Sequence, residues 1–286
     1  GYQGMNRSAP IAGDGHFEVA SVAPGTYTIV AQGMMRRTGA PGAGDPPPQE
    51  AAVQTIAVEG EDVVVPLVTT PGSTVRGRIT VEGDASALAN RPLRISSYAP
   101  HASDGEVSFS GRGRVAPDLS FEIAGLRGEQ AITLQSLPEG WWVKDVRVAG
   151  QSALDGFDFG QGRAFTGVEI IVSTKLTGLA GTVTMPTGTV ASDYAVVLFS
   201  EDEARWTMDG PAQATGARIV RPGLDGAFRM AGLRPGGYYV LAMPAEQADS
   251  QALGDPDQLR DLASRARTVE VREGEIAPLT LTLVNR

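Results

Sequence analysis

The chain has 286 residues, 42% of them hydrophobic and 6% aromatic, with 36 glycines and 19 prolines, a composition that favours short strands and many turns over long helices or one large core. Its formal net charge is −9 and its arginines are scattered, which argues against nucleic acid as a partner, because phosphate binding needs clustered Lys and Arg. The absence of cysteine excludes disulfides, thiolate catalysis and cysteine-based zinc sites, and the longest apolar runs have strand length, which excludes a membrane span.

The first predicted element is a β-hairpin that begins at residues 14–17, which read Asp-Gly-His-Phe. Asp-Gly supplies a tight turn, because Gly accepts positive φ and Asp bonds to nearby backbone. Phe17 is then expected to point inward at the start of a strand. Pro-Gly at 24–25 reverses the chain again, and the apolar residues of 27–31 alternate with period two, as in a half-buried strand.

The same hairpin pattern recurs near the C-terminus, at residues 225–228 and 233–242, with every shared residue at the same spacing. A weaker copy lies at residues 118–121 and 126–128, where the Pro-Gly and Tyr are lost. The other expected strands, in chain order, are residues 53–58, 63–68, 75–79, 93–97, 168–172, 179–183, 194–199, 269–271 and 279–284. This repeat predicts three tandem β-sandwich units, at residues 1–70, 71–174 and 175–286.

One short helix is predicted in the third unit, near residues 256–266. Asp255 can cap it, and Pro256 suits its first turn. Its apolar positions form one stripe, made of Leu259, Leu262, Ala263 and Ala266. We expect the helix to plug one end of the third sandwich.

The first unit is short, because far fewer residues precede Phe17 than precede the equivalent Phe of the other units. By comparison it lacks roughly three opening strands. Two interpretations stay open. Either the sequence is a fragment of a longer protein, or strands from another chain complete the unit by β-strand addition, as in a subunit of an extracellular filament.

Three motifs occur in order along the sequence: Gly77-x-Ile79 and Gly181-x-Val183, then Asp-Gly-x-Phe, then Leu-x-Pro-Gly-x-Tyr-x-Val-x-Ala. Together these motifs resemble the carboxypeptidase regulatory-like domain. Residues 137–146 and 193–202, with Trp206, are similar to tandem versions in large exported proteins of soil bacteria such as Acidobacteria. The resemblance covers essentially the whole chain. It implies an all-β fold of tandem prealbumin-like, carbohydrate-binding-like Greek-key β-sandwiches.

Domains of this family are accessory modules, found beside peptidases, in outer-membrane receptors or in surface proteins. The resemblance therefore implies a non-catalytic structural or adhesive role in a secreted or cell-surface bacterial protein. The expected partners are other protein chains or other domains of the same protein, including a homopolymer formed by β-strand addition. Polysaccharide is a further candidate, whereas no cofactor, metal or catalytic residue is expected.

Metal and covalent chemistry have weak candidates in the sequence. The only histidines, His16 and His101, lie far apart in a turn and a loop, where solvated side chains are expected. The acidic loops at 155–158 and 255–261 suggest calcium binding as a hypothesis. Their spacing matches no EF-hand loop, and the role of Asp in turns explains these residues better. Lys175 and Asn285 fall roughly where some sandwich domains of Gram-positive surface proteins cross-link Lys to Asn, although Lys175 also reads as a linker residue.

The three tryptophans are the candidate ligand-binding residues, because sugars stack on flat exposed aromatic rings. Trp206 lies in a long polar loop and is the best candidate for an exposed platform. Such a loop Trp can also fold back over the edge of its own sandwich. Trp141 and Trp142 are adjacent, so in one strand they face opposite sides, one toward the core and the other toward solvent.

Overall fold

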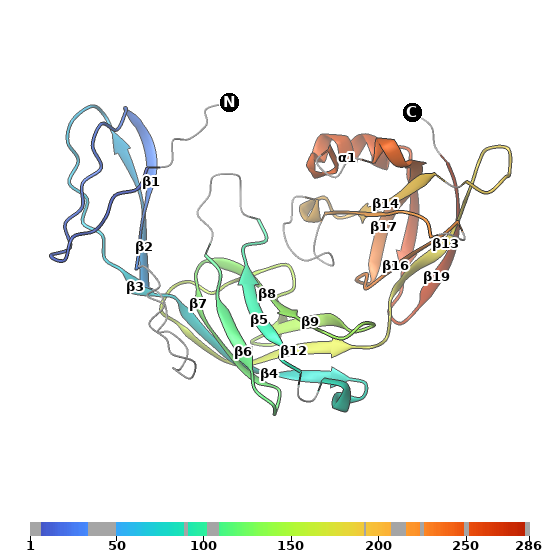
Figure 1. Cartoon of the computed structure of the whole chain (residues 1–286), viewed down its shortest axis with the longest axis horizontal. Coiled ribbons are helices and arrows are strands. Elements are labelled where there is room, and N and C mark those ends of the chain that lie inside the picture. Colours follow the sequence, from blue (N-terminus) through green and yellow to red (C-terminus); the bar gives the residue numbers. More distant parts are fainter. Residues whose placement is uncertain are drawn as a thin grey trace. The chain divides into compact units, whose positions relative to one another are not determined.

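The computed structural model describes residues 7–33, 50–88, 91–101, 109–191, 193–206, 216–223, 226–248 and 252–283. The expected all-β class is confirmed, since strands arranged in sheets dominate these residues (Figure 1). The chain forms two compact units, and the boundary between them lies after Gly72. None of the described helices is both long and apolar enough to cross a membrane.

The first unit contains one small antiparallel sheet in the order β1-β2-β3. Its strands are β1 (Gly25–Gln32), β2 (Glu50–Val58) and β3 (Thr70–Pro71). The turn at residues 14–16 forms as expected, with the His16 backbone N–H donating to Asp14 Oδ1 at 3.0 Å. Phe17, however, lies outside any strand, so the expected strand start at this residue is wrong.

The strand expected at residues 63–68 is also wrong, because this segment joins no sheet. Val64 and Val68 are 94% and 79% exposed. The physical reason is visible in the later sheets, where the closing strand of each repeat pairs in parallel with an opening strand. No opening strand of this kind pairs with residues 63–68 in the part of the chain that the structure describes.

The middle of the chain folds into a sheet of nine described strands, which we call the curled sheet. Its order is β10-β9-β12-β4-β7-β6-β5-β8-β11. The strands are β4 (Ser73–Glu82), β5 (Arg94–Tyr98), β6 (Arg112–Val115), β7 (Ser120–Leu126), β8 (Glu129–Gln135), β9 (Trp142–Val148), β10 (Gln151–Ser152), β11 (Phe157–Asp158) and β12 (Ala164–Ser173), and the 3-10 turn η1 (Ala85–Leu88) follows β4. Because β6 pairs with both β5 and β7, the two layers of the sandwich form one continuous ladder around a single core.

The last part of the chain forms two separate sheets, which together we call the C-terminal sandwich. Their orders are β16-β13-β19 and β15-β14-β17-β18. The strands are β13 (Gly178–Thr184), β14 (Tyr194–Ser200), β15 (Ala217–Val220), β16 (Ala227–Ala231), β17 (Gly236–Pro244), β18 (Arg267–Val271) and β19 (Ile276–Thr282). The short helices are η2 (Glu203–Arg205), η3 (Ala245–Gln247), η4 (Ala252–Gly254) and α1 (Pro256–Ala263).

The predicted helix is present as α1 and is capped as expected, with the Asp257 backbone N–H donating to Asp255 Oδ1 at 2.9 Å. Its position differs from the expectation. Leu259 and Leu262 pack with Val197 and Leu241 in a second core, so the helix covers the outer face of the four-stranded sheet rather than one end. Every residue of β14 is therefore buried, on both faces of the sheet.

The tyrosine of the repeated hairpin has the same role in the first and last copies. The Tyr27 hydroxyl donates to the Ala23 carbonyl at 2.8 Å, and the Tyr238 hydroxyl donates to the Arg234 carbonyl at 2.9 Å. In both copies the acceptor lies four residues upstream, just before Pro-Gly. The Tyr side chain therefore fixes the turn that starts the next strand, which explains its spacing in the sequence.

Candidate functional site

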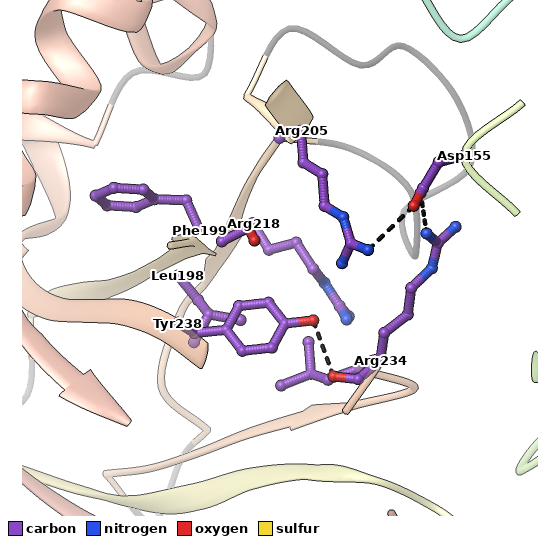
Figure 2. A pocket seen from close by; sticks show the side chains of 10 residues that line it. Asp155, Leu198, Phe199, Arg205, Arg218, Arg234 and Tyr238 are labelled. Atoms are coloured by element: carbon purple, nitrogen blue, oxygen red, sulfur yellow. Dashed lines mark hydrogen bonds and ion pairs between the residues drawn. The ribbon is translucent and has the colours of Figure 1, made fainter. Parts of the chain in front are cut away.

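A small cavity lined largely by the C-terminal sandwich gathers three arginines, and we call it the arginine pocket. It has a volume of about 30 Å³. Its lining residues are Asp155, Leu198, Phe199, Ser200, Arg205, Gly216, Arg218, Leu233, Arg234 and Tyr238. Figure 2 shows the three guanidinium groups, the Asp155 carboxylate and the Tyr238 hydroxyl around one space.

Three different local structures position the arginines. Arg205 ends η2, whose N-terminus is capped by Asp202 Oδ1, which accepts from the Ala204 N–H at 3.1 Å. Arg218 lies on β15 opposite Leu198 of β14. Arg234 lies in the turn that the Tyr238 hydroxyl fixes.

One carboxylate bridges two of these arginines. Asp155 lies between β10 and β11 of the curled sheet and forms ion pairs with Arg234 and with Arg205, the latter at 3.0 Å between Nη2 and Oδ2. Arg234 also donates to the Leu154 carbonyl at 3.2 Å. Planar guanidinium groups suit such contacts, because their N–H groups match carboxylate geometry.

Arg218 has no carboxylate partner among the described residues. Both of its Nη atoms donate to the Ala231 carbonyl, each at 3.2 Å. Burial lowers the pKa of the Arg218 guanidinium, since desolvation disfavours the charged form. Burial likewise raises the pKa of Tyr238, although Arg205, Arg234 and Arg218 act in the opposite direction. The pocket thus holds a positive charge that no described carboxylate pairs with.

A second charged cluster lies where the curled sheet meets the C-terminal sandwich. Lys144 Nζ is 2.7 Å from Glu82 Oε1 and 2.6 Å from Glu273 Oε1. The Trp142 Nε1–H donates to the Lys175 carbonyl at 3.0 Å, and the Gly274 N–H donates to Thr177 Oγ1 at 2.8 Å. These contacts connect the two parts at both ends of the connecting segment.

The Lys144 cluster predicts a pH-dependent stability. The hydrogen bond from Lys144 lowers the pKa of Glu82 in the folded chain. The ion pair therefore contributes fully to stability above the pKa of an unfolded Glu, about 4.3, and this contribution disappears as the pH falls through the lower pKa of the folded state. Lys144→Met should therefore lower the urea midpoint at pH 7, and the difference from the wild type should vanish near pH 3. Urea titrations at both pH values measure this. A pH-independent difference, or an equal loss in Arg94→Met on the exposed side of β5, would contradict it.

The structure does not bring the predicted tryptophans together as a site. Trp206 is 4% exposed and lies against Phe199, with ring centroids 5.5 Å apart, and its Nε1–H donates to the Ser200 carbonyl at 2.7 Å. The expected exposed platform is therefore wrong at this residue, since η2 places the ring of Trp206 against its own sheet. Trp142 is core at 2% exposed, while Trp141 is partly buried against the same core. Sugar binding by any of the three stays a prediction.

The remaining candidate residues have ordinary structural surroundings. His16 and His101 are exposed. Asp158 Oδ1 accepts the Gly160 N–H at 2.9 Å, as turn chemistry predicts for this loop. Asn285 lies outside the described residues. Within the described part of the chain, no group of three or more His, Cys, Asp and Glu could hold a metal ion.

Sequence reasoning missed the arginine pocket. Its charged residues lie up to 79 positions apart, so no local spacing connects them. The one available signal was Arg218, a charged residue in the short apolar stretch Ala-Arg-Ile-Val of β15. A charge in such a stretch indicates a partner or a polar cavity.

Comparisons with known proteins give distant likenesses. The chain matches no protein-family model and no curated protein sequence. Similar solved structures include a streptococcal ancillary pilin, with 12% identity over 91% of this chain and 76% of that one and a TM-score of 0.28. Another is GBS52, a minor pilin of Streptococcus agalactiae, with 11% identity over 73% of this chain and 94% of that one and a TM-score of 0.30. A B repeat unit of the collagen-binding surface protein of Staphylococcus aureus is 9% identical, and the match covers 60% of this chain and 84% of that one, with a TM-score of 0.22. The fold therefore rests on the sheet topology described above.

Proposed function

We propose that the chain is a series of non-catalytic β-sandwich modules, an incomplete one at residues 1–70 and two others at residues 71–174 and 175–286, with a structural or adhesive role in a secreted or cell-surface protein. The junction between the curled sheet and the C-terminal sandwich carries this proposal. Only residues 174–177 separate β12 from β13, and the contacts of Trp142 and Lys144 hold both sides. Such a short, bonded junction suits modules that keep a fixed spacing, and the resemblance to carboxypeptidase regulatory-like domains supports the same accessory role.

Protease treatment of intact producing cells tests the location. A surface protein should be digested while the cells stay unbroken, and a cytosolic marker should survive as the control. Survival of the chain until the cells are lysed would contradict the proposal.

A second candidate role, assembly with other chains by strand addition, is favoured by residues 62–69. In the later sheets the closing strand pairs in parallel with an opening strand, β12 with β4 and β19 with β13. Residues 62–69 occupy the closing position of the first unit and expose Val63, Val64 and Val68. An added strand would cover these side chains and satisfy the backbone groups.

A peptide copy of an opening strand tests strand addition directly. A synthetic peptide with the sequence of residues 73–82 should bind the chain saturably, as measured by fluorescence anisotropy. The matched control carries Gly77→Val, because a Cβ at Gly77 would lie 1.8 Å from the Val168 carbonyl oxygen in the native pairing. Equal binding of both peptides, or none, would speak against strand addition, and so would the absence of filaments in electron micrographs of the concentrated protein.

A further inference from the structure

The arginine pocket has more positive than negative charge among the described residues. Arg234 and Arg205 share the Asp155 carboxylate, and Arg205 Nε is also 3.7 Å from Asp202 Oδ2. Arg218 adds a third guanidinium, which among the described residues is hydrogen-bonded to the Ala231 carbonyl alone. The excess of charge therefore resides at Arg218, in a partly buried position where an anion would be screened little by water.

Two guanidinium groups at this site have N–H groups to offer. The Arg205 Nε is buried and makes no hydrogen bond within the described part of the chain. Both Nη atoms of Arg218 donate to a single carbonyl. A guanidinium group has five N–H donors, so N–H groups of Arg218 remain that could donate to a ligand. A buried N–H without an acceptor is costly, and an incoming anionic oxygen would remove that cost.

The size and the existing contacts limit the ligand chemistry. A cavity of about 30 Å³ has room for a single small group rather than a sugar ring or a nucleotide. The ion pairs with Asp155 already show that the Arg205 and Arg234 guanidinium groups donate to carboxylate oxygens. Planar guanidinium groups favour carboxylate and sulfate groups, which present two oxygens to one fork.

We propose that the arginine pocket binds one oxyanion group, a carboxylate or a sulfate, between Arg205, Arg218 and Arg234. The group is a free ion or the anionic substituent of a larger molecule whose remainder stays outside the cavity. Asp155 partly occupies the site and repels the incoming anion. Tyr238 forms the apolar wall while its hydroxyl remains on the Arg234 carbonyl.

Isothermal titration with sodium sulfate and sodium acetate, at constant ionic strength, tests the proposal. Saturable binding is expected in the wild type. Arg218→Met should weaken it at least tenfold, and Arg218→Lys, which keeps the charge but loses the fork, should weaken it by a smaller factor. The matched control is Arg229→Met, on the exposed side of β16, which should bind as the wild type does.

Asp155→Asn separates a binding site from a purely structural cluster. Removal of the competing carboxylate should raise oxyanion affinity at least threefold. Weaker binding in Asp155→Asn, equal affinities in Arg218→Met and Arg229→Met, or no saturable binding in the wild type would overturn the proposal. Binding assays with dextran sulfate, and with neutral dextran as the control, then distinguish a free ion from an oxyanion group carried by a larger molecule. Arg218-dependent binding of dextran sulfate identifies a polymer-borne group, and binding of sulfate alone identifies a free ion.

Discussion

Gly181→Ala is expected to unfold the C-terminal sandwich. A Cβ at this position would lie 1.6 Å from the Leu279 carbonyl oxygen and 2.6 Å from its carbon. Both are backbone atoms of β19, which pairs in parallel with β13 along seven registered positions from Gly178 to Thr184. The clash cannot be relieved by a side-chain rotation, so the strands must separate and lose both hydrogen bonds and core contacts.

The expected loss is more than about 4 kcal/mol, which is a large part of the 5–15 kcal/mol that stabilises a typical domain. Urea denaturation followed by tryptophan fluorescence measures it, because Trp206 lies in this sandwich. Gly77→Ala should have a similar effect on the curled sheet, where the Cβ would lie 1.8 Å from the Val168 carbonyl oxygen. Gly254→Ala is the control, since nothing lies within 4 Å of its Cβ position. A shared urea midpoint for Gly181→Ala and Gly254→Ala would refute this explanation.

Trp206→Ala should destabilise the chain by about 3–5 kcal/mol, the usual cost of deleting a buried large aromatic side chain. The ring fills the core between the four-stranded sheet and α1, in contact with Phe199. Trp206→Phe should keep most of the packing and lose chiefly the hydrogen bond to the Ser200 carbonyl. Loss of this bond should lower the free energy of unfolding by about 1 kcal/mol, in addition to the effect of the smaller ring. Urea midpoints of the two variants measure the difference.

The same two variants test the predicted role of Trp206 in sugar binding. A polysaccharide array is first probed with the wild type, and a sugar platform at Trp206 requires that any binding disappear in Trp206→Ala. Because this variant is also expected to lose stability, Trp206→Phe supplies the folded comparison. If sugar binding is unchanged in Trp206→Phe and is lost only when the protein unfolds, Trp206 has a role in core packing and none in contacting the sugar. No binding by the wild type would exclude the sugar platform.

Local chemistry made much of the secondary structure predictable. The Asp255 cap, the Pro256 start and the Leu259–Leu262 spacing act within a few residues, so α1 could be located from the sequence. Gly181 likewise marked an opening strand correctly. The reason for this glycine is tertiary, since it is the approach of β19 that forbids a side chain there.

The errors arose where pairing and packing decide the outcome. Residues 63–68 have the apolar pattern of a strand, but a strand forms only with a partner. Trp206 lies in a polar stretch, and only the folded chain shows that η2 turns its ring onto β14. The arginine pocket depends on residues from four separate segments, and periodicity contains no information about such a convergence.

The parallel pairing of first and last strands has a mechanical consequence. β4 opens the curled sheet and β12 closes it, with Thr74 opposite Ala164 and Glu82 opposite Ser173. Pulling on the chain at Ser73 and at Ser173 therefore stretches two strands in opposite directions along their shared length. The tension is distributed over all the hydrogen bonds of that ladder at once, in shear, rather than opening them one after another. β13 and β19 repeat this geometry, so resistance to stretching is built into each of these two sheets.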